Sequence, residues 1–258
     1  MIPALIDASL TTAIKEHLAL NADPERAPRM RAYMKSSMPY RGVAAPALHK
    51  ICRDLFRQHP LNGFEAWQAT VLNLWHGAEF REDRYAAIDL TGDRLYRSHQ
   101  TPAALPLYEE LIVSGAWWDY VDTVAVDRIG PILRSHPAEV QPMMLDWSRS
   151  EHLWKRRTSI ICQVGARAHV DWDLLRSCIE PNLADRDFFV RKAIGWALRQ
   201  FARSQPEVVA GYVGELGPRL SPLSRREATK HLSRDSPICG ERIGVQVREI
   251  VLSRRGPQ

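Results

Sequence analysis

The feature that most constrains this chain is the helical spacing of its apolar residues, which continues along the whole sequence. Alternating β-branched runs are nearly absent, glycines number only 14, and the 17 prolines are dispersed. Five of those prolines stand where a helix is expected to begin, because proline lacks the N–H that the first helical turn leaves unpaired. We therefore predict an all-α protein. The five prolines are Pro24, Pro102, Pro137, Pro206 and Pro222. The predicted helices are 4–20, 24–36, 46–58, 63–75, 80–95, 102–114, 117–126, 137–148, 151–166, 172–179, 187–203, 206–215, 222–232 and 240–253.

A recurrence in the middle of the chain indicates how these helices are arranged. Trp118, Arg157 and Trp196 follow one another at intervals of 39 residues. A period near 40 is typical of HEAT-type helix pairs, which stack into an α-solenoid with one concave face. We predict a single HEAT-like domain of antiparallel helix pairs over 1–258, with a frayed tail at 253–258. Equivalent repeat positions should then line one face, so these three side chains are expected to converge.

The charge distribution gives the first indication of a partner. The chain carries 35 basic and 30 acidic residues and has a pI of about 9.2. Residues 151–258 hold 19 basic against 12 acidic residues, whereas residues 1–150 hold 16 against 18. Of the basic residues 29 are arginine, whose planar fork suits phosphate oxygens. A basic concave face that binds nucleic acid would explain this excess. The codon usage of a GC-rich genome is the alternative explanation for the arginines.

Other classes of protein are excluded by what the sequence lacks. The mean hydropathy is −0.30, and no apolar run approaches the roughly 20 residues that cross a bilayer. The first residues show no secretory signal, so we expect a cytoplasmic protein without membrane contact. The four cysteines are isolated, which argues against a disulfide framework or a zinc site. Nucleotide-binding and common hydrolase motifs are absent as well, so we predict neither a metal nor a cofactor.

The most unusual segment of the chain is 115–122, Gly-Ala-Trp-Trp-Asp-Tyr-Val-Asp. Trp118 and Asp122 are four residues apart and therefore share one face of a helix. A carboxylate one turn from an aromatic wall is suited to stabilising a cation. The alternative is that Trp117 and Trp118 are both core residues, with Asp119 as a helix cap and Asp122 in a surface ion pair.

Two adjacent arginines form a second candidate site on the predicted helix 151–166. Arg156 and Arg157 must face different ways, because neighbours on a helix lie about 100° apart. One of them is expected to reach a phosphate while the other meets solvent or an acidic residue of the next repeat. An ordinary solvated charge run is the alternative.

A third candidate site is a mixed stripe on the predicted helix 187–203. Phe189, Lys192, Trp196 and Arg199 fall on one helical face. A stripe that mixes aromatic rings with cations suits a surface that touches both a base and phosphates. Gly195 costs about 1 kcal/mol inside a helix relative to alanine, which suggests the close approach of a neighbour or ligand. The alternative is an aromatic core with solvated cations.

Taken together, these segments resemble the AlkD family of DNA alkylation repair glycosylases. These are HEAT-like proteins that excise N3- and N7-alkylated purines. The similar stretches run over most of the chain. They are YMKSSMPYRGV (33–43), Arg-Glu at 81–82 with Tyr-Ala-Ala-Ile at 85–88, WWDYVD (117–122), LWKRRTSI (153–160) and DFFVRKAIGWALRQF (187–201).

The resemblance implies a role for each matching residue. Trp118 and Trp196 correspond to the tryptophans of an aromatic cleft, and Asp122 corresponds to the catalytic aspartate. It further implies a monomeric enzyme that acts on double-stranded DNA. The lesion would not enter a deep base pocket, and the two tryptophans would instead touch the deoxyribose and backbone. The positions expected to bind DNA or the lesion are Arg157, Arg199, Phe189, Tyr33, Lys192 and Arg156.

One departure from the family pattern concerns the N-terminal DNA contacts. The family often has a basic pair after the proline that corresponds to Pro46, whereas this chain has Leu48, His49 and Lys50. A non-catalytic HEAT-like scaffold that binds DNA, RNA or protein is the alternative to the enzyme. Such a scaffold would need the basic face but no carboxylate between two tryptophans.

Overall fold

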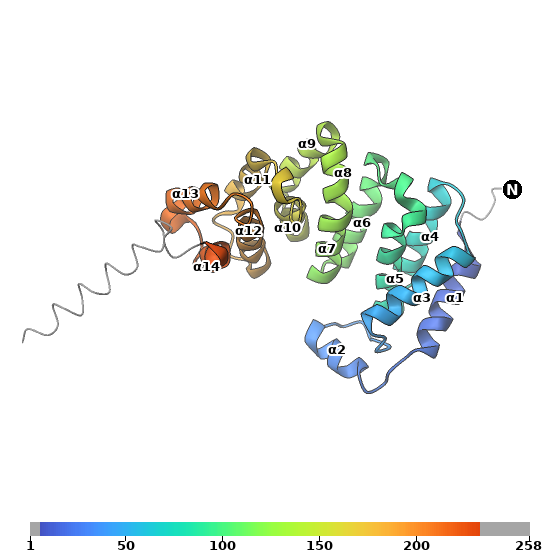
Figure 1. The fold of residues 1–258 in the computed structure, drawn as a ribbon. Coiled ribbons are helices and arrows are strands. Elements are labelled where there is room, and N and C mark those ends of the chain that lie inside the picture. Colours follow the sequence, from blue (N-terminus) through green and yellow to red (C-terminus); the bar gives the residue numbers. More distant parts are fainter. Residues whose placement is uncertain (1–5, 233–258) are drawn as a thin grey trace, which may run out of the picture. The chain divides into compact units, whose positions relative to one another are not determined.

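The prediction of an all-α protein is confirmed. The structure is a computed structural model that describes residues 6–232, and within this range it contains fourteen α-helices, short 3-10 turns and no strand (Figure 1). The predicted helix 240–253 and the predicted frayed tail 253–258 lie outside the described residues.

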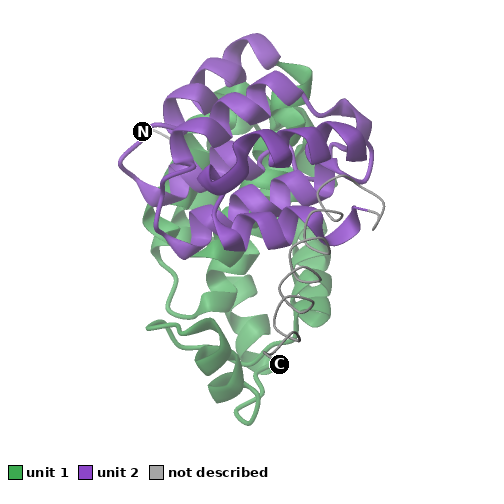
Figure 2. Cartoon of the chain, turned by 90° about the vertical axis from the view of Figure 1, so that its left-hand side faces the viewer, with its two compact units in different colours: residues 1–136 green, residues 137–258 purple. Residues whose placement is uncertain are grey.

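The chain divides into two compact units, Met1–His136 and Pro137–Gln258, which Figure 2 distinguishes by colour. Each unit is described by itself, and the single domain expected over 1–258 stays a prediction. The helices of the first unit are α1 (Ala8–Leu20), α2 (Ala27–Met34), α3 (Ala45–Gln58), α4 (Phe64–His76), α5 (Arg81–Gly92), α6 (Leu105–Gly115), α7 (Trp118–Val124) and α8 (Gly130–Ser135). The helices of the second unit are α9 (Pro137–Trp147), α10 (Leu153–Ile161), α11 (Trp172–Ile179), α12 (Phe188–Phe201), α13 (Pro206–Leu216) and α14 (Pro222–Ala228).

Both units are built from packed helix pairs in two layers. In the first unit, α3, α5 and α7 pack side by side, and each also packs against a partner helix, α1, α4 or α6. In the second unit α10, α12 and α14 form a similar row, with α9, α11 and α13 packed against it. This pairing is that of an all-α solenoid, as the 39-residue recurrence predicted.

Three of the five prolines begin helices as expected. Pro137, Pro206 and Pro222 are the first residues of α9, α13 and α14. Pro102 opens a 3-10 turn that precedes α6, and Pro24 lies three residues before α2. The rule for helix starts therefore holds best where the connecting loop is short.

The helix predicted over 117–126 continues further than the sequence suggested. After α7 the backbone passes through a π-helical turn, Ala125–Ile129, directly into α8. Pro131 lies in the first turn of α8. Because proline has no backbone N–H, a regular α-helix continuing through this position would lack one hydrogen bond. The wider turn accommodates it, and the N–H of Gly130 donates to the carbonyl of Ala125, five residues back. Turns of this kind occur often at functional sites.

Candidate functional site

Helix α7 buries one side and presents the two predicted site residues on another. Tyr120 is 1% exposed, and its ring packs against Trp75 and Tyr85 at centroid distances of 5.1 and 5.4 Å. Trp118 and Asp122 are both partly exposed, and the helical spacing puts them on one face. The sequence prediction of an accessible tryptophan with a carboxylate one turn away is therefore compatible with the structure.

The neighbouring carboxylate, Asp119, is committed to holding α7 in place. Arg81 Nη2 donates to both of its oxygens, at 2.7 and 2.6 Å, and the Tyr85 hydroxyl donates to Oδ2 at 2.6 Å. The side chains of Arg81 and Asp119 are 6% and 13% exposed. Asp119 is not a helix cap, because the N-cap position belongs to Trp117, which makes no capping bond with its side chain.

Two further contacts extend this network. The hydroxyls of Tyr40 and Tyr85 lie 2.8 Å apart, and the Arg81 guanidinium lies 4.2 Å from the centroid of the Tyr120 ring. Burial, together with the charge of Asp119, raises the pKa of Tyr85, so its hydroxyl stays protonated and donates. The network thus joins the segment before α3, the start of α5 and the start of α7.

The two N-terminal family-like stretches also meet each other. Glu82 is fully buried and accepts hydrogen bonds from the backbone N–H groups of Arg41, Gly42 and Val43 at 2.8–3.2 Å. Gly42 has a φ of 88°, and a Cβ there would lie 2.1 Å from the carbonyl oxygen of Asp23. These stretches of sequence are therefore one structural assembly that supports α7.

A largely apolar cavity of about 360 Å³ lies beside this network within the first unit. Tyr33, Tyr40, Tyr85, Asp119 and Thr123 are among the residues that line it. Tyr33, on α2, is 78% exposed, as suits a side chain that meets a ligand. The structure therefore places this predicted accessory aromatic at the same cavity as the residues that hold α7.

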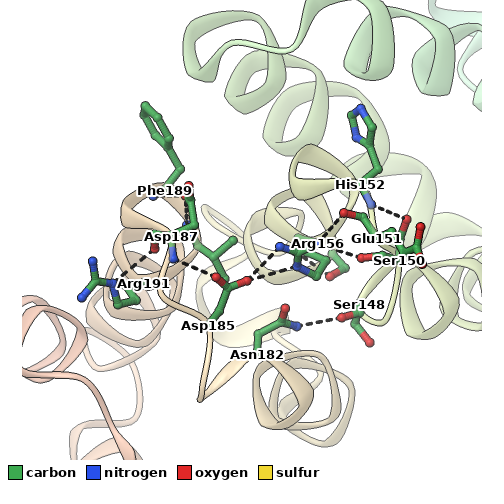
Figure 3. A network of polar contacts seen from close by, with 12 residues as sticks. Ser148, Ser150, Glu151, His152, Arg156, Asn182, Asp185, Asp187, Phe189 and Arg191 are labelled. Carbon is green, nitrogen blue, oxygen red and sulfur yellow. Dashed lines mark hydrogen bonds and ion pairs between the residues drawn. The ribbon is translucent and has the colours of Figure 1, made fainter.

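In the second unit, Arg156 binds an acidic residue of the following helix pair, one of the two options that the sequence left open. Its Nη2 and Nε donate to Asp185 Oδ2 at 2.9 and 3.2 Å, and its Nη1 donates to the carbonyls of Ser150 and Glu151 (Figure 3). Arg157 is only 4% exposed, and its Nη1 donates to the carbonyl of Phe189 at 2.6 Å. Both arginines therefore brace the start of α12.

The first turn of α12 is fixed by its own cap and by aromatic packing. Asp187 is the N-cap residue and accepts the N–H groups of Phe189 and Val190. The Phe189 ring is partly exposed and lies 5.0 Å from the Trp154 ring, centroid to centroid. Figure 3 shows this phenylalanine pointing away from the polar contacts around Arg156.

Further along α12, two residues of the predicted stripe bind one carboxylate. Lys192 Nζ lies 2.8 Å from Glu227 Oε1, and Arg199 Nη1 lies 2.6 Å from Oε2. Lys230 makes a third contact at 2.8 Å. Burial alone would raise the pKa of Glu227, but the hydrogen bonds from Lys192 and Lys230 lower it to about 2. Three cations around one carboxylate leave a positive surplus next to the partly exposed Trp196.

The close approach expected at Gly195 is that of a neighbouring helix. A Cβ at this position would lie 2.5 Å from Glu227 Cβ and 2.8 Å from the carbonyl oxygen of Ser224. The glycine therefore lets α14 pack tightly on α12, and this packing brings Glu227 to the two cations of α12.

The predicted site residues are divided between the two units. Tyr33, Trp118 and Asp122 belong to the first unit, and the convergence of the site across both units stays a prediction. The residues of the second unit are Arg156, Arg157, Phe189, Lys192, Trp196 and Arg199. Sequence reasoning missed Arg81, Asp119 and Glu227 as structural partners. The sequence signal for Arg81 and Asp119 was the resemblance, whose matching stretches include both residues but do not reach Glu227.

Within residues 6–232 no three His, Cys, Asp or Glu side chains are grouped so that they could hold a metal ion. No helix of the same range combines the length and apolar character needed to cross a membrane.

Comparison with known proteins shows the family to which this chain belongs. A solved structure described as a predicted DNA alkylation repair enzyme from Enterococcus faecalis superposes with a TM-score of 0.75 at 28% sequence identity. The match covers 83% of this chain and 98% of that one. Comparison with curated protein sequences gives no significant match. The family model for DNA alkylation repair enzymes matches residues 14–232, and the chain therefore belongs to the DNA alkylation repair enzyme family.

Proposed function

We propose that this chain is a monofunctional DNA glycosylase that hydrolyses the N-glycosidic bond of N3- and N7-alkylated purines. Its family and the arrangement of α7 support this proposal. The enzyme acts as a cytoplasmic monomer on double-stranded DNA and uses no cofactor. Base excision repair of alkylation damage is its role.

The substrate's own charge decides what the enzyme must supply. Alkylation at N3 or N7 makes the purine cationic, so the base is a good leaving group without protonation. As the glycosidic bond lengthens, the base takes the electron pair and positive charge develops on the deoxyribose. A fixed carboxylate stabilises that charge more in the transition state than in the ground state. Asp122 has this role, and it also orients the attacking water.

The observation that carries this assignment is the position of Asp122 on α7. Asp122 is partly exposed and lies one turn from the partly exposed Trp118, on the same face of the helix. We propose that this shared face meets the sugar. Asp119 takes part in the network with Arg81 and Tyr85 that holds α7 against α5. Contacts with the deoxyribose and backbone are proposed for Trp118 and, in the second unit, for Trp196.

The decisive experiment compares two aspartate variants of the full chain. Asp122→Asn keeps the size of the side chain and removes the charge, and Asp127→Asn makes the same change at an exposed position of the π-helical turn. We expect single-turnover release of 7-methylguanine to fall about 10²-fold or more in Asp122→Asn, because the substitution removes one preorganised electrostatic interaction. Asp127→Asn should release the base at the wild-type rate, and DNA affinity should change little in either variant.

Equal rates for Asp122→Asn and wild type would overturn the assignment. A wild type that releases none of several alkylpurines would favour the non-catalytic scaffold.

A further inference from the structure

A second hollow in the first unit, of about 830 Å³, is surrounded by arginines. Arg53 and Arg57 come from α3, Arg94 opens the 3-10 turn after α5, and Arg128 belongs to the π-helical turn. Helices α3 and α5 pack side by side, and α5 also packs against the π-helical turn. Residues that are distant in sequence therefore meet at one place inside a single unit.

Three of these arginines have their guanidinium groups available to a ligand. Arg53, Arg57 and Arg94 are exposed. Arg53 and Arg57 are four residues apart and so lie on one face of α3. The acidic group nearest to Arg57 is Asp54 at 3.9 Å, and that carboxylate already accepts from Lys50 Nζ at 2.7 Å.

The fourth arginine is fixed at the wall of the hollow. Arg128 Nε donates to Thr91 Oγ1 at 2.8 Å, and its Nη2 donates to the carbonyl of Ile88 at 3.2 Å. Its Nη1 donates to the carbonyl of Asp127 at 3.1 Å. A Cβ on Gly92 would lie only 2.1 Å from Arg128 Nη2, so the absence of a side chain at position 92 makes room for this cation.

The carboxylates at the hollow are already engaged with other groups. Asp89 Oδ2 lies 2.6 Å from His49 Nδ1, and Asp93 Oδ1 accepts the N–H of Leu95 at 2.9 Å. Four arginines and two carboxylates line the hollow, so it carries more positive than negative charge. Residues 1–136 as a whole hold 15 basic and 16 acidic residues, so this surplus is a local concentration. Arginine forks of this kind match the oxygens of a phosphate group.

We propose that this hollow binds backbone phosphates of duplex DNA and gives the first unit a DNA contact of its own. The proposal rests on the proposed function in taking DNA as the substrate. A free nucleotide fits less well, because a base needs an aromatic face on which to stack. The phenylalanine that lines the hollow, Phe56, is 1% exposed and offers no such face.

The test measures how DNA binding depends on salt. The double variant Arg53→Gln/Arg94→Gln of the full chain is titrated with undamaged duplex DNA at several salt concentrations. Removing one arginine that binds a phosphate lowers the slope of log affinity against log salt by about 0.9, so we expect a decrease of about 1.8 for two. The control variant Arg134→Gln removes an exposed arginine at the end of α8 that does not line the hollow. We expect it to keep the wild-type slope.

The outcomes separate this proposal from the proposed function. An unchanged slope in the double variant overturns the phosphate site even if the wild type releases 7-methylguanine. A decreased slope supports the site even if the wild type releases no base. A third arm titrates the same proteins with inorganic phosphate. One result would assign the hollow to a free anion and overturn the DNA contact. In that case the double variant would lose the phosphate binding seen in wild type, while the salt slope of DNA binding would be the same for all variants. The proposed phosphate site would also be overturned if Arg134→Gln decreased the salt slope by as much per removed arginine as the double variant does.

Discussion

The guanidinium of Arg81 holds both carboxylate oxygens of Asp119, at 2.7 and 2.6 Å, and so fastens α5 to the first turn of α7. Trp118 precedes this aspartate directly, and Asp122 follows it within one turn. The ion pair therefore fixes the helix that carries the proposed catalytic carboxylate, although neither partner needs to touch the DNA.

The first prediction is that Arg81→Met destabilises the protein by about 3–5 kcal/mol, because it leaves the Asp119 carboxylate buried without its partner. The double variant Arg81→Met/Asp119→Leu removes both charges and should recover part of this stability. Urea unfolding of the three proteins measures the effect. A double variant no more stable than Arg81→Met would show that the ion pair is not the cause.

The second prediction concerns two helical glycines with opposite surroundings. Gly195→Ala places a Cβ 2.5 Å from Glu227 Cβ, so α14 must shift, and we expect the protein to be destabilised by about 1–3 kcal/mol. Gly211, in α13, has no atom within 4 Å of such a Cβ. Gly211→Ala should therefore stabilise the protein by about 0.5–1 kcal/mol through the helix preference of alanine. Thermal unfolding of both variants checks this, and a stabilising Gly195→Ala would contradict the tight packing of α12 and α14.

Much of the fold could be predicted from the sequence, because apolar spacing and proline positions are local signals. Helix α13 begins at Pro206 as expected for this reason. The continuation of α7 through a π-helical turn into α8 could not be predicted in the same way. Whether Pro131 ends a helix or is accommodated inside it depends on the turn that precedes it, and sequence spacing does not show that turn.

The shared helical face of Trp118 and Asp122 could be predicted from their spacing, and both side chains are partly exposed. The contacts that support the candidate site were less predictable. Arg157 belongs to a charged run in the sequence, yet it lies buried and holds the carbonyl of Phe189. Such pairings join residues about 30 to 40 positions apart. They depend on how neighbouring helix pairs stack, which the spacing within one helix does not specify.

The third prediction follows from the three cations around Glu227. Its pKa is about 2 in the folded protein and 4.5 ordinarily, so the carboxylate stabilises the fold fully above pH 4.5. This contribution disappears as the pH falls from 4.5 toward 2, where the carboxylate takes up its proton. Glu227→Gln should therefore be less stable than wild type at neutral pH, and the difference should shrink across that window. Glu215→Gln, at an exposed position of α13, should keep the wild-type dependence on pH.

Glu227→Gln also leaves Lys192, Arg199 and Lys230 without their shared carboxylate, so its affinity for undamaged DNA should rise at low salt. Unfolding free energies between pH 2 and 7, with DNA titrations at neutral pH, measure both effects. A stability difference that does not depend on pH would show that Glu227 is not held ionised by these cations.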